Sequence, residues 1–239
     1  MDLKEISILS DTIERHWYYI SKAKAMKKFF YDKSPITILD IGAGSGFFSR
    51  YLLSHTAAQE AWCVDISYSY EHQDTVKGKP IYFVKEVEHN FASADCMLVM
   101  DVLEHVDNDV DILKFYSEKL LKNSQIFISV PAFPWLWSNH DVFLEHKRRY
   151  TLHTLEKVVV NSGLQIEQLC YYFGLVFPLA AALRLPQKFI KSSNAPRSQL
   201  QRHSKISNKI LTSICTLEMS VMKFNKICGL SVFCLATKK

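Results

Sequence analysis

The sequence predicts an α/β fold of the Rossmann-like, doubly wound type, with a seven-stranded sheet, an N-terminal helical lid and a helical insertion before the last strand. Short apolar runs rich in β-branched residues alternate with amphipathic segments, which is typical of parallel strands joined by helices. The first of these runs ends in a turn with glycines at 42, 44 and 46. The 239 residues, 48% of them hydrophobic and 22% charged, suit one large domain with an insertion.

The elements follow one another along the chain. We expect an amphipathic helix over 10–31, a buried strand over 35–41, and a helix that starts directly after the glycine turn. Asp107 or Asn108 is the expected N-cap of a later helix. The remaining elements are expected at helix 47–55, strands 60–67, 80–87 and 94–103, helix 107–122, strand 124–132, helix 151–163, and strands 164–173 and 230–239.

These elements predict three parts of the chain. The lid occupies 1–34, a ligand-binding domain occupies 35–173 and 229–239, and a basic and apolar helical insertion occupies 174–228.

The stretch "ITILDIGAGSGFFSRYLL" (residues 36–53) places the glycine turn at the carboxyl end of the first strand, where doubly wound folds bind ligands. Glycines let the backbone approach a ligand closely and adopt positive φ. A dinucleotide turn would carry its third glycine at the position of Phe47. Asp40 would repel a pyrophosphate and suit a cationic amino group. The expected ligand is therefore a nucleoside that carries an amino acid.

The stretch "LDIGAGSG" (39–46) resembles motif I of the class I S-adenosylmethionine-dependent methyltransferases. Asp65, at the end of the second strand, stands where an acidic side chain can accept both ribose hydroxyls, and "MDVLEHV" ends the fourth strand. "HWYYISKAKAM" and "VPAFPWLWSNHDVFLEHKRRYT" narrow the resemblance to a subgroup of small bacterial methyltransferases of types 11 and 12. It implies S-adenosylmethionine as cofactor, bound by Lys22, Asp40, Gly42, Ala43, Gly44, Gly46, Asp65, Ile66, Glu86, Met100 and Asp101.

Two of these residues depart from the pattern of the family. Lys22 stands where relatives tend to carry an arginine that reaches the methionine carboxylate; a solvated lysine on a basic helix face is the alternative. Glu86 stands where an aspartate commonly contacts the adenine, so the adenine contacts are less well defined than the ribose contact.

Methyl transfer from a sulfonium mainly requires in-line alignment of acceptor, methyl and sulfur and the exclusion of water. The side chains for this task must come from the loops after the fourth and fifth strands. The candidate catalytic residues there are His105, His140, His146, Arg148 and Arg149.

Alternative roles stay open for these candidates. His105 could close a helix N-terminus by hydrogen bonding. Arg148 or Arg149 could hold a carboxylate or phosphate of an anionic acceptor through bidentate hydrogen bonds. The same arginines could instead pair with Asp141 and Glu145 to fix the loop.

The basic charge is concentrated in one part of the chain. Residues 168–217 carry seven basic residues and no acidic residue, although the net charge of the whole chain is only +5. An apolar stretch followed by basic residues predicts that 174–209 contacts an anionic membrane or caps a lipid-like acceptor. A packed insertion with a solvated basic face is the alternative. The apolar part is interrupted by Pro178 and is too short to span a bilayer.

The predicted activity is methylation of a small-molecule or lipid- or glycan-linked acceptor of anionic character. A nucleic-acid methyltransferase stays open because of the basic insertion, but "MDVLEH" stands where adenine methyltransferases carry an N-P-P-Y-like motif. A non-catalytic module that binds the cofactor also stays open, although the intact glycine turn with Asp40 and Asp65 argues against it.

The six cysteines form no C-x-x-C pair, so we expect buried free thiols and no metal site. The N-terminal residues lack the apolar stretch of a signal peptide. We therefore expect a cytoplasmic protein, with 174–209 as its candidate contact with the inner face of the membrane.

Overall fold

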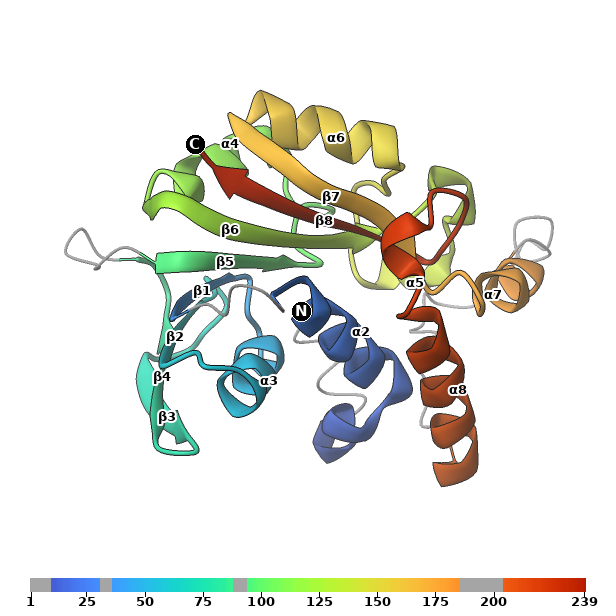
Figure 1. Ribbon diagram of the computed structural model, residues 1–239, viewed down its shortest axis with the longest axis horizontal. Helices are drawn as coiled ribbons and strands as arrows, with labels where there is room; N and C mark the ends of the chain where they lie inside the picture. The colour runs from blue at the N-terminus through green and yellow to red at the C-terminus, as the bar shows by residue number, and fades with distance from the viewer. Residues whose placement is uncertain (1–9, 31–35, 88–93, 185–203) are drawn as a thin grey trace.

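The computed structural model describes residues 10–30, 36–87, 94–184 and 204–239. Its centre is one eight-stranded sheet with the order β3-β4-β2-β1-β5-β6-β8-β7 (Figure 1). β4, β2, β1, β5 and β6 run parallel, and β8 is antiparallel to both β6 and β7. The strands are β1 (Thr37–Ile41), β2 (Glu60–Val64), β3 (His72–Val76), β4 (Lys79–Val84), β5 (Ala94–Met100), β6 (Leu120–Pro131), β7 (Leu164–Tyr172) and β8 (Ser231–Lys238). The predicted Rossmann-like fold is confirmed, but the predicted number of strands was too low by one.

The strand that the sequence analysis missed is β3. Its residues "HQDTV" are mostly exposed and pair antiparallel with β4 at the edge of the sheet. Lys77 and Gly78 join the two strands, and both have positive φ (52° and 78°), as a two-residue hairpin turn requires. Hydrophobic periodicity could not reveal β3, because an edge strand whose side chains are mostly exposed needs no apolar alternation.

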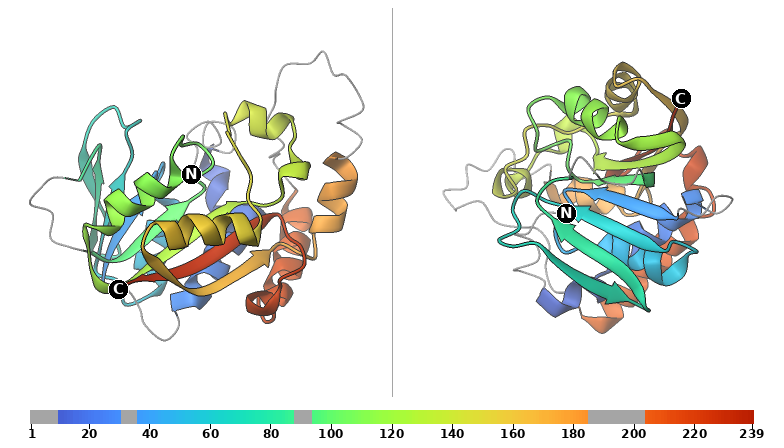
Figure 2. Two further views of the ribbon diagram at one scale, coloured as in Figure 1. Left: turned by 90° about the horizontal axis from the view of Figure 1, so that it is seen from above. Right: turned by 90° about the vertical axis from the view of Figure 1, so that its left-hand side faces the viewer.

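Helices cover both faces of the sheet, as Figures 1 and 2 show. α2 and α3 pack on one face through a buried cluster that includes Met26, Phe48 and Phe127. α4 and α6 cover the other face through a second cluster that includes Leu113 and Leu155. The helices and 3-10 turns are η1 (Ser10–Arg15), α2 (Trp17–Lys27), η2 (Lys28–Phe30), α3 (Phe47–His55), α4 (Asp109–Ser117), η3 (Pro134–Leu136), α5 (Asn139–Phe143), α6 (Leu152–Asn161), α7 (Phe177–Arg184), α8 (Lys205–Glu218) and η5 (Met222–Phe224).

One predicted boundary between a helix and a strand was wrong. The helix expected over 107–122 ends at Ser117, because β6 already begins at Leu120. The start of this helix agrees with the prediction: Asn108 is the N-cap, and its side chain accepts from Asp111 N at 3.3 Å.

The carboxyl ends of β1, β2, β5 and β6 meet at one edge of the sheet, since these strands are parallel. The loop that follows β6, residues 132–150, is called the acceptor loop below, after the acceptor contact that the sequence analysis predicts for it. It folds back onto the strand that it leaves: Tyr150 N donates to Pro131 O at 2.9 Å, and Phe133 N donates to Tyr150 O at 2.7 Å. The acceptor loop is therefore held at the same edge as the glycine turn.

The segment between β7 and β8 contributes α7, α8 and η5. α8 lies along α2, where Trp17 N donates to Asn208 Oδ1 at 3.0 Å. Residues 185–203 of the predicted insertion and 1–9 and 31–34 of the predicted lid lie outside the described residues. None of the helices in the described part of the chain is long and apolar enough to cross a membrane.

Candidate active site

The turn after β1 is made from backbone that only glycine adopts easily. Gly42, Gly44 and Gly46 have φ of 62°, 55° and 69°. A Cβ atom at Gly42 would lie 2.6 Å from Val102 Cγ2, on the loop that follows β5. Gly42 N also donates to Val64 O at 2.8 Å. The turn thus joins the ends of β1, β2 and β5 and brings its backbone close to any ligand at this edge.

Asp40 is buried immediately before the turn. Its Oδ2 accepts from Ser49 Oγ at 2.7 Å, whereas its buried Oδ1 has no hydrogen-bond partner among the described residues. Burial raises the pKa of Asp40 to about 6, against the opposing effect of the hydrogen bond from Ser49. A buried carboxylate oxygen without a donor is costly. Asp40 therefore fits the cationic amino group that the sequence analysis predicts for the ligand.

Asp65, at the end of β2, turns its carboxylate toward the glycine turn. Its Oδ2 accepts from Gly44 N at 3.0 Å, and its Oδ1 accepts from Ser67 N at 2.9 Å. Tyr68 Oη donates to Gly44 O at 2.7 Å and ties the same two segments together. Each carboxylate oxygen can accept more than one hydrogen bond, so Asp65 retains capacity for ribose hydroxyls.

Lys22 of α2 forms a buried ion pair with Asp101. Lys22 Nζ donates to Asp101 Oδ1 at 2.7 Å, to Asp101 Oδ2 at 2.5 Å and to Tyr18 Oη at 2.9 Å. Burial alone would lower the pKa of Lys22, but Asp101 and Tyr18 outweigh it and raise that pKa. Lys22 is fully buried, so the alternative of a solvated lysine was wrong. The predicted contact between Lys22 and the methionine carboxylate stays a prediction.

The other predicted cofactor residues differ in their exposure. Ala43 and Met100 are buried, whereas Ile66 is 88% exposed and Glu86 is exposed just after β4. Residues 88–93, which belong to the segment expected to approach the adenine, lie outside the described residues. The adenine contacts therefore stay predictions.

Asp141 organises the acceptor loop. Its Oδ2 accepts from Ser138 N at 2.8 Å, and its Oδ1 accepts from Arg149 Nε at 2.6 Å. His146 Nδ1 lies 2.9 Å from the same Oδ1. Burial alone would raise the pKa of Asp141, but the hydrogen bond from His146 and the charge of Arg149 hold it below its usual range. Since an ionised carboxylate only accepts, His146 donates from Nδ1.

Both candidate arginines are engaged within the fold. Arg149 is buried, and its guanidinium also donates to Ala132 O at 2.8 Å. Arg148 donates to Asp109 Oδ2 at 3.1 Å and to Val106 O and Asp107 O at 2.9 Å each. These contacts favour the alternative in which ion pairs fix the loop, although Arg148 pairs with Asp109 and not with Asp141 or Glu145. A contact between either arginine and the acceptor stays a prediction.

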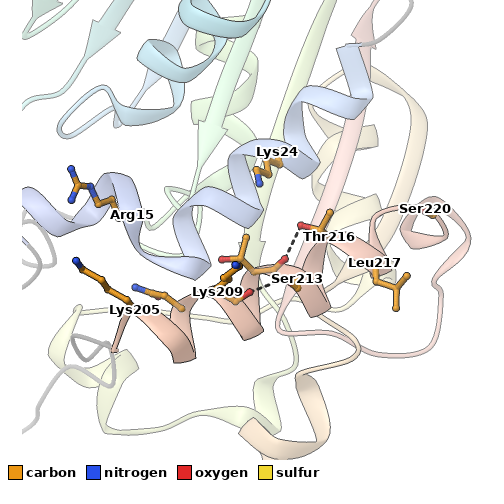
Figure 3. A pocket seen from close by; sticks show the side chains of 10 residues that line it. Arg15, Lys24, Lys205, Lys209, Ser213, Thr216, Leu217 and Ser220 are labelled. Carbon is orange, nitrogen blue, oxygen red and sulfur yellow. Dashed lines mark hydrogen bonds between the residues drawn. The ribbon is translucent and has the colours of Figure 1, made fainter.

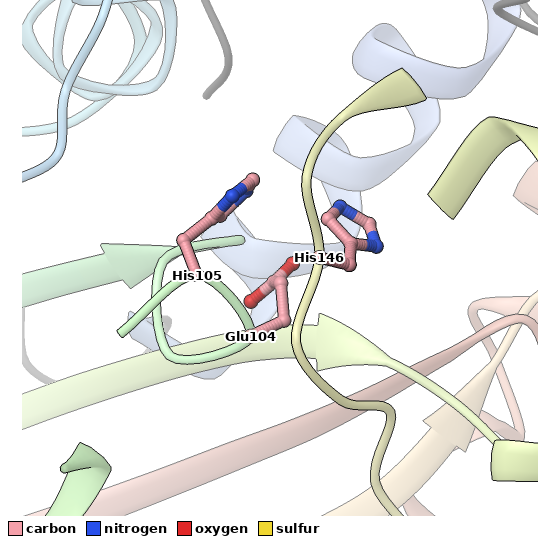
Figure 4. A group of neighbouring side chains, drawn as sticks. All are labelled: Glu104, His105 and His146. Atoms are coloured by element: carbon pink, nitrogen blue, oxygen red, sulfur yellow. The ribbon is translucent and has the colours of Figure 1, made fainter. Parts of the chain in front are cut away.

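Glu104, His105 and His146 gather between the loop after β5 and the acceptor loop (Figure 4). The two imidazole rings lie 4.8 Å apart between centroids and are almost perpendicular. Glu104 is fully buried, and neither carboxylate oxygen has a hydrogen-bond partner among the described residues. Burial, reinforced by the charge of Asp101, raises the pKa of Glu104 well above its ordinary value. Two of the predicted catalytic histidines thus meet at one place.

His140 lies on α5, close to the charge of Arg184 at the end of α7. Burial, followed by the positive charge of Arg184, lowers the pKa of His140 to about 3. Burial and the charge of Arg149 lower the pKa of Arg184 to about 10. His140 is therefore neutral at neutral pH, and the acceptor loop receives a cation from the predicted basic insertion.

Three residues of this edge were missed by the sequence analysis: Tyr18, Ser49 and Tyr68. Tyr18 precedes Lys22 by one helical turn, and this i, i+4 spacing could have indicated the contact. Ser49 contacts Asp40 and Tyr68 contacts Gly44 only because the turn folds back on itself. No spacing in the sequence indicates these two contacts.

Comparisons with known proteins agree with this geometry. A family model described as a methyltransferase domain matches residues 15–169, more than half of the chain. An S-adenosylmethionine-dependent methyltransferase from Mesorhizobium loti is similar in structure, with a TM-score of 0.55 and 12% identity over 91% of this chain and 98% of that chain. The plantazolicin methyltransferase BamL, solved with a triazolic desmethylPZN analog and SAH, is similar with a TM-score of 0.54 and 12% identity over 96% of this chain and 85% of that chain. No curated protein sequence matches the chain.

Proposed function

Because the chain belongs to the methyltransferase-domain family and its cofactor is S-adenosylmethionine, we propose that it methylates a small-molecule or lipid- or glycan-linked acceptor. The observation that carries this proposal is the meeting of two half-sites at one edge of the sheet. The glycine turn with Asp40 and Asp65 forms the first half. The loop after β5 and the acceptor loop form the second, joined where Lys147 N donates to Glu104 O at 2.7 Å.

The residues of the first half fit the cofactor. The buried Oδ1 of Asp40 can accept from its amino group, and Asp65 can accept from its ribose hydroxyls. When bound, the cofactor supplies a methyl group that its sulfonium already activates. The chain then has to hold the acceptor in line with that methyl and keep water out.

An apolar surface beside the acceptor loop supports a lipid-linked acceptor. Leu175, two residues before α7, and Leu179 and Leu183 on α7 follow one another at intervals of four residues and are 55%, 61% and 63% exposed. Phe177 of the same helix contacts Trp135 of the acceptor loop, with ring centroids 5.8 Å apart. An acyl or prenyl chain bound along this stripe would end at the acceptor loop.

A basic groove supports contact between the insertion and an anionic surface. It lies between α2 and α8, has a volume of about 680 Å³, and has no acidic residue in its lining (Figure 3). Its cations are Arg15, Lys24, Lys205 and Lys209. The last two belong to 174–209, the segment that we propose as the peripheral membrane contact.

Arg184 supports the anionic character of the acceptor. It lies near the acceptor loop, where it interacts electrostatically with His140, Asp141 and Arg149. Asp141 already balances the charge of Arg149. A positive charge at this place would favour a phosphate or carboxylate on the acceptor.

Transfer of radiolabel tests the proposed acceptor class. The protein is incubated with S-adenosylmethionine labelled in its methyl group and with three substrate pools: bacterial membrane lipids, water-soluble metabolites, and RNA. We expect label in the lipid pool or in the metabolite pool, and none without enzyme. Label in RNA alone would contradict the proposal and favour the nucleic-acid alternative.

Calorimetry tests the cofactor half separately. We expect wild-type protein to bind S-adenosylmethionine and its demethylated product with micromolar affinity, about −8 kcal/mol. Asp65→Ala should weaken both by about 10- to 100-fold, because hydrogen bonds to a charged acceptor contribute about 1.5–3 kcal/mol. Asp74→Ala, which removes an exposed carboxylate on β3, is the matched control and should leave both affinities unchanged. Tighter binding of NAD would overturn the assignment.

A further inference from the structure

The cluster of Glu104, His105 and His146 has the composition of a metal site. Each residue offers one ligand atom, and these oxygen and nitrogen atoms all lie within 4.8 Å of one another (Figure 4). Three ligands of one tetrahedral ion at about 2.1 Å would lie about 3.4 Å apart, so modest side-chain rotations would close the set. The sequence analysis expected no metal site because it judged the cysteines alone, whereas this cluster joins residues some 40 positions apart.

Glu104 is the observation that points to a ligand. It is fully buried, and both of its carboxylate oxygens lack a hydrogen-bond partner among the described residues. Burying such a group is costly unless a cation or a donor meets it. Lys22 forms its ion pair with Asp101 instead. A cation between Glu104 and the two imidazoles would satisfy the carboxylate.

His146 is already oriented as a metal ligand. Its Nδ1 faces Asp141 Oδ1 at 2.9 Å, and its side chain is only 6% exposed. A carboxylate that accepts from one imidazole nitrogen fixes the tautomer and makes the other nitrogen the coordinating one. Arg149 Nε donates to the same Oδ1 of Asp141 at 2.6 Å. The acceptor loop thus presents Nε2 of His146 with a supporting carboxylate behind it.

We propose that Glu104, His105 and His146 bind one divalent transition-metal ion of the zinc type. Two imidazoles and one carboxylate suit Zn²⁺ or Co²⁺, whereas Mg²⁺ prefers oxygen ligands alone and retains its waters. Three protein ligands leave a coordination position open, as catalytic zinc sites do. An oxygen of the acceptor would take that position.

The role of the ion in the reaction rests on the proposed function. A hydroxyl of the acceptor coordinated to the ion has a lowered pKa. Its O–H bond would break on coordination and release the proton to bulk solvent before the methyl transfer, and the oxygen would then form a bond to the methyl carbon. The carbon–sulfur bond breaks, its electron pair stays on sulfur, and the sulfonium becomes a neutral thioether. No oxidant or reductant is needed.

Metal titration of the chelator-treated, full-length protein tests the site without any acceptor. Calorimetry with Zn²⁺ should give one tight site per chain, and Co²⁺ should give the visible absorption of a four- or five-coordinate ion with nitrogen ligands. Mg²⁺ should give neither heat nor competition. The absence of a Zn²⁺ or Co²⁺ signal from folded protein would overturn the proposal.

Single variants assign the ligands. Glu104→Gln, which keeps the shape of the side chain, and His146→Ala should each weaken Zn²⁺ binding by at least 100-fold. Asp141→Asn should weaken it by about 10- to 100-fold, since it orients His146 without touching the ion. His153→Ala is the matched control, because His153 forms an exposed pair with Glu156 at 3.9 Å on α6 and should leave binding unchanged. Equal affinities for wild type and Glu104→Gln would contradict the assignment.

Two readouts on the same samples keep this proposal separate from the proposed function. Circular dichroism shows whether each variant is folded, and calorimetry with S-adenosylmethionine reports on the glycine turn. Loss of metal binding with the cofactor affinity intact is expected from Glu104→Gln. A wild-type protein that binds cofactor but no metal would overturn the metal site alone, whereas one that binds metal but no cofactor would contradict the proposed function alone.

Discussion

The two halves of the candidate site meet at one edge of the sheet but are built differently. The cofactor half consists of backbone: three glycines in the left-handed region, with carboxylates that still have lone pairs to offer. In the other half, the acceptor loop is held by buried charged side chains that satisfy one another, with Asp141 joined to Ser138, His146 and Arg149.

This difference separates two kinds of failure. In the cofactor half, the glycines are closely surrounded by other atoms, so we expect a single added methyl group to obstruct cofactor binding. In the acceptor half, charge compensation in a buried environment is critical, so removal of one partner leaves another charge inadequately paired. Substitutions in the first half should mainly lower cofactor affinity, and substitutions in the second should mainly lower the free energy of unfolding.

The largest effect is expected for Arg149→Ala. The guanidinium is 3% exposed and pairs with Asp141, which is fully buried. Breaking a buried pair costs about 3–5 kcal/mol, and we expect about 3 kcal/mol because His146 and Ser138 remain as partners of Asp141. The free energy of unfolding from urea denaturation measures this loss.

Arg148→Ala is the matched control for this prediction. Arg148 is the neighbouring residue, its side chain is 32% exposed, and it pairs with Asp109 at 3.1 Å. We expect a partly exposed pair of this kind to contribute about 1 kcal/mol, less than the fully buried pair of Arg149. Equal losses of unfolding free energy from the two variants would show that burial does not distinguish the two arginines. Buried charge pairs would then not be what stabilises the acceptor half.

The next effect concerns Gly42→Ala. The residue has φ of 62°, and the new Cβ would lie 2.6 Å from Val102 Cγ2. Valine is stiff at χ1, so either the turn or the loop after β5 must shift. We expect the affinity for S-adenosylmethionine to fall at least about 100-fold, which corresponds to about 2.7 kcal/mol. Calorimetry provides the measurement.

Gly163→Ala is the control that separates the effect of the steric clash at Gly42 from the effect of positive φ. Gly163 has φ of 78°, yet a Cβ there would meet nothing within 4 Å. The left-handed backbone costs both variants about 1–2 kcal/mol of folding free energy. Only Gly42→Ala should also lose cofactor affinity. Normal affinity in folded Gly42→Ala would refute the idea that space beside the glycines controls binding.

The same contrast explains what could be predicted from the sequence. The glycine turn, Asp40 and Asp65 lie at the ends of consecutive strands, so local spacing places them and the helix after the turn, α3, was predicted with its observed bounds. The edge strand β3 was missed because its pairing depends on a two-residue turn and not on buried residues.

The acceptor half could not be predicted to the same depth. Its residues were named from their crowding in the sequence, but the partner of Arg148, Asp109, lies 39 positions away along the chain. A spacing rule carries no information on such pairs, because they form only when separate loops fold to one edge. The burial of Glu104 could not be predicted from the sequence either, because it depends on tertiary packing.

The smallest effect on cofactor affinity, and the sharpest test of the cofactor half, is the pH dependence that Asp40 imposes. Its pKa is raised to about 6 in the folded protein by burial. An amino group of the cofactor favours the ionised carboxylate, so affinity should be nearly constant above pH 7 and about tenfold lower at pH 5, or about 1.4 kcal/mol. Calorimetry at pH 5, 6 and 7 measures this slope, and Asp40→Asn should bind weakly with little dependence on pH.

Without cofactor, the same carboxyl group should act on stability in the opposite direction. Because its pKa is higher in the folded state than the ordinary 3.8, the folded state binds the proton more tightly than the unfolded state. The stabilisation is complete below about pH 4 and is lost as the pH rises through about 6, and the shift corresponds to about 3 kcal/mol. The unfolding free energy of wild type, measured relative to that of Asp40→Asn, should therefore fall as the pH rises from 4 to 7. The affinity of wild type for the cofactor should rise over the same range. If stability and cofactor affinity instead changed in the same direction with pH, the titrating group would not be Asp40. A buried carboxyl group whose ionised form binds the amino group of the cofactor should make the two change in opposite directions.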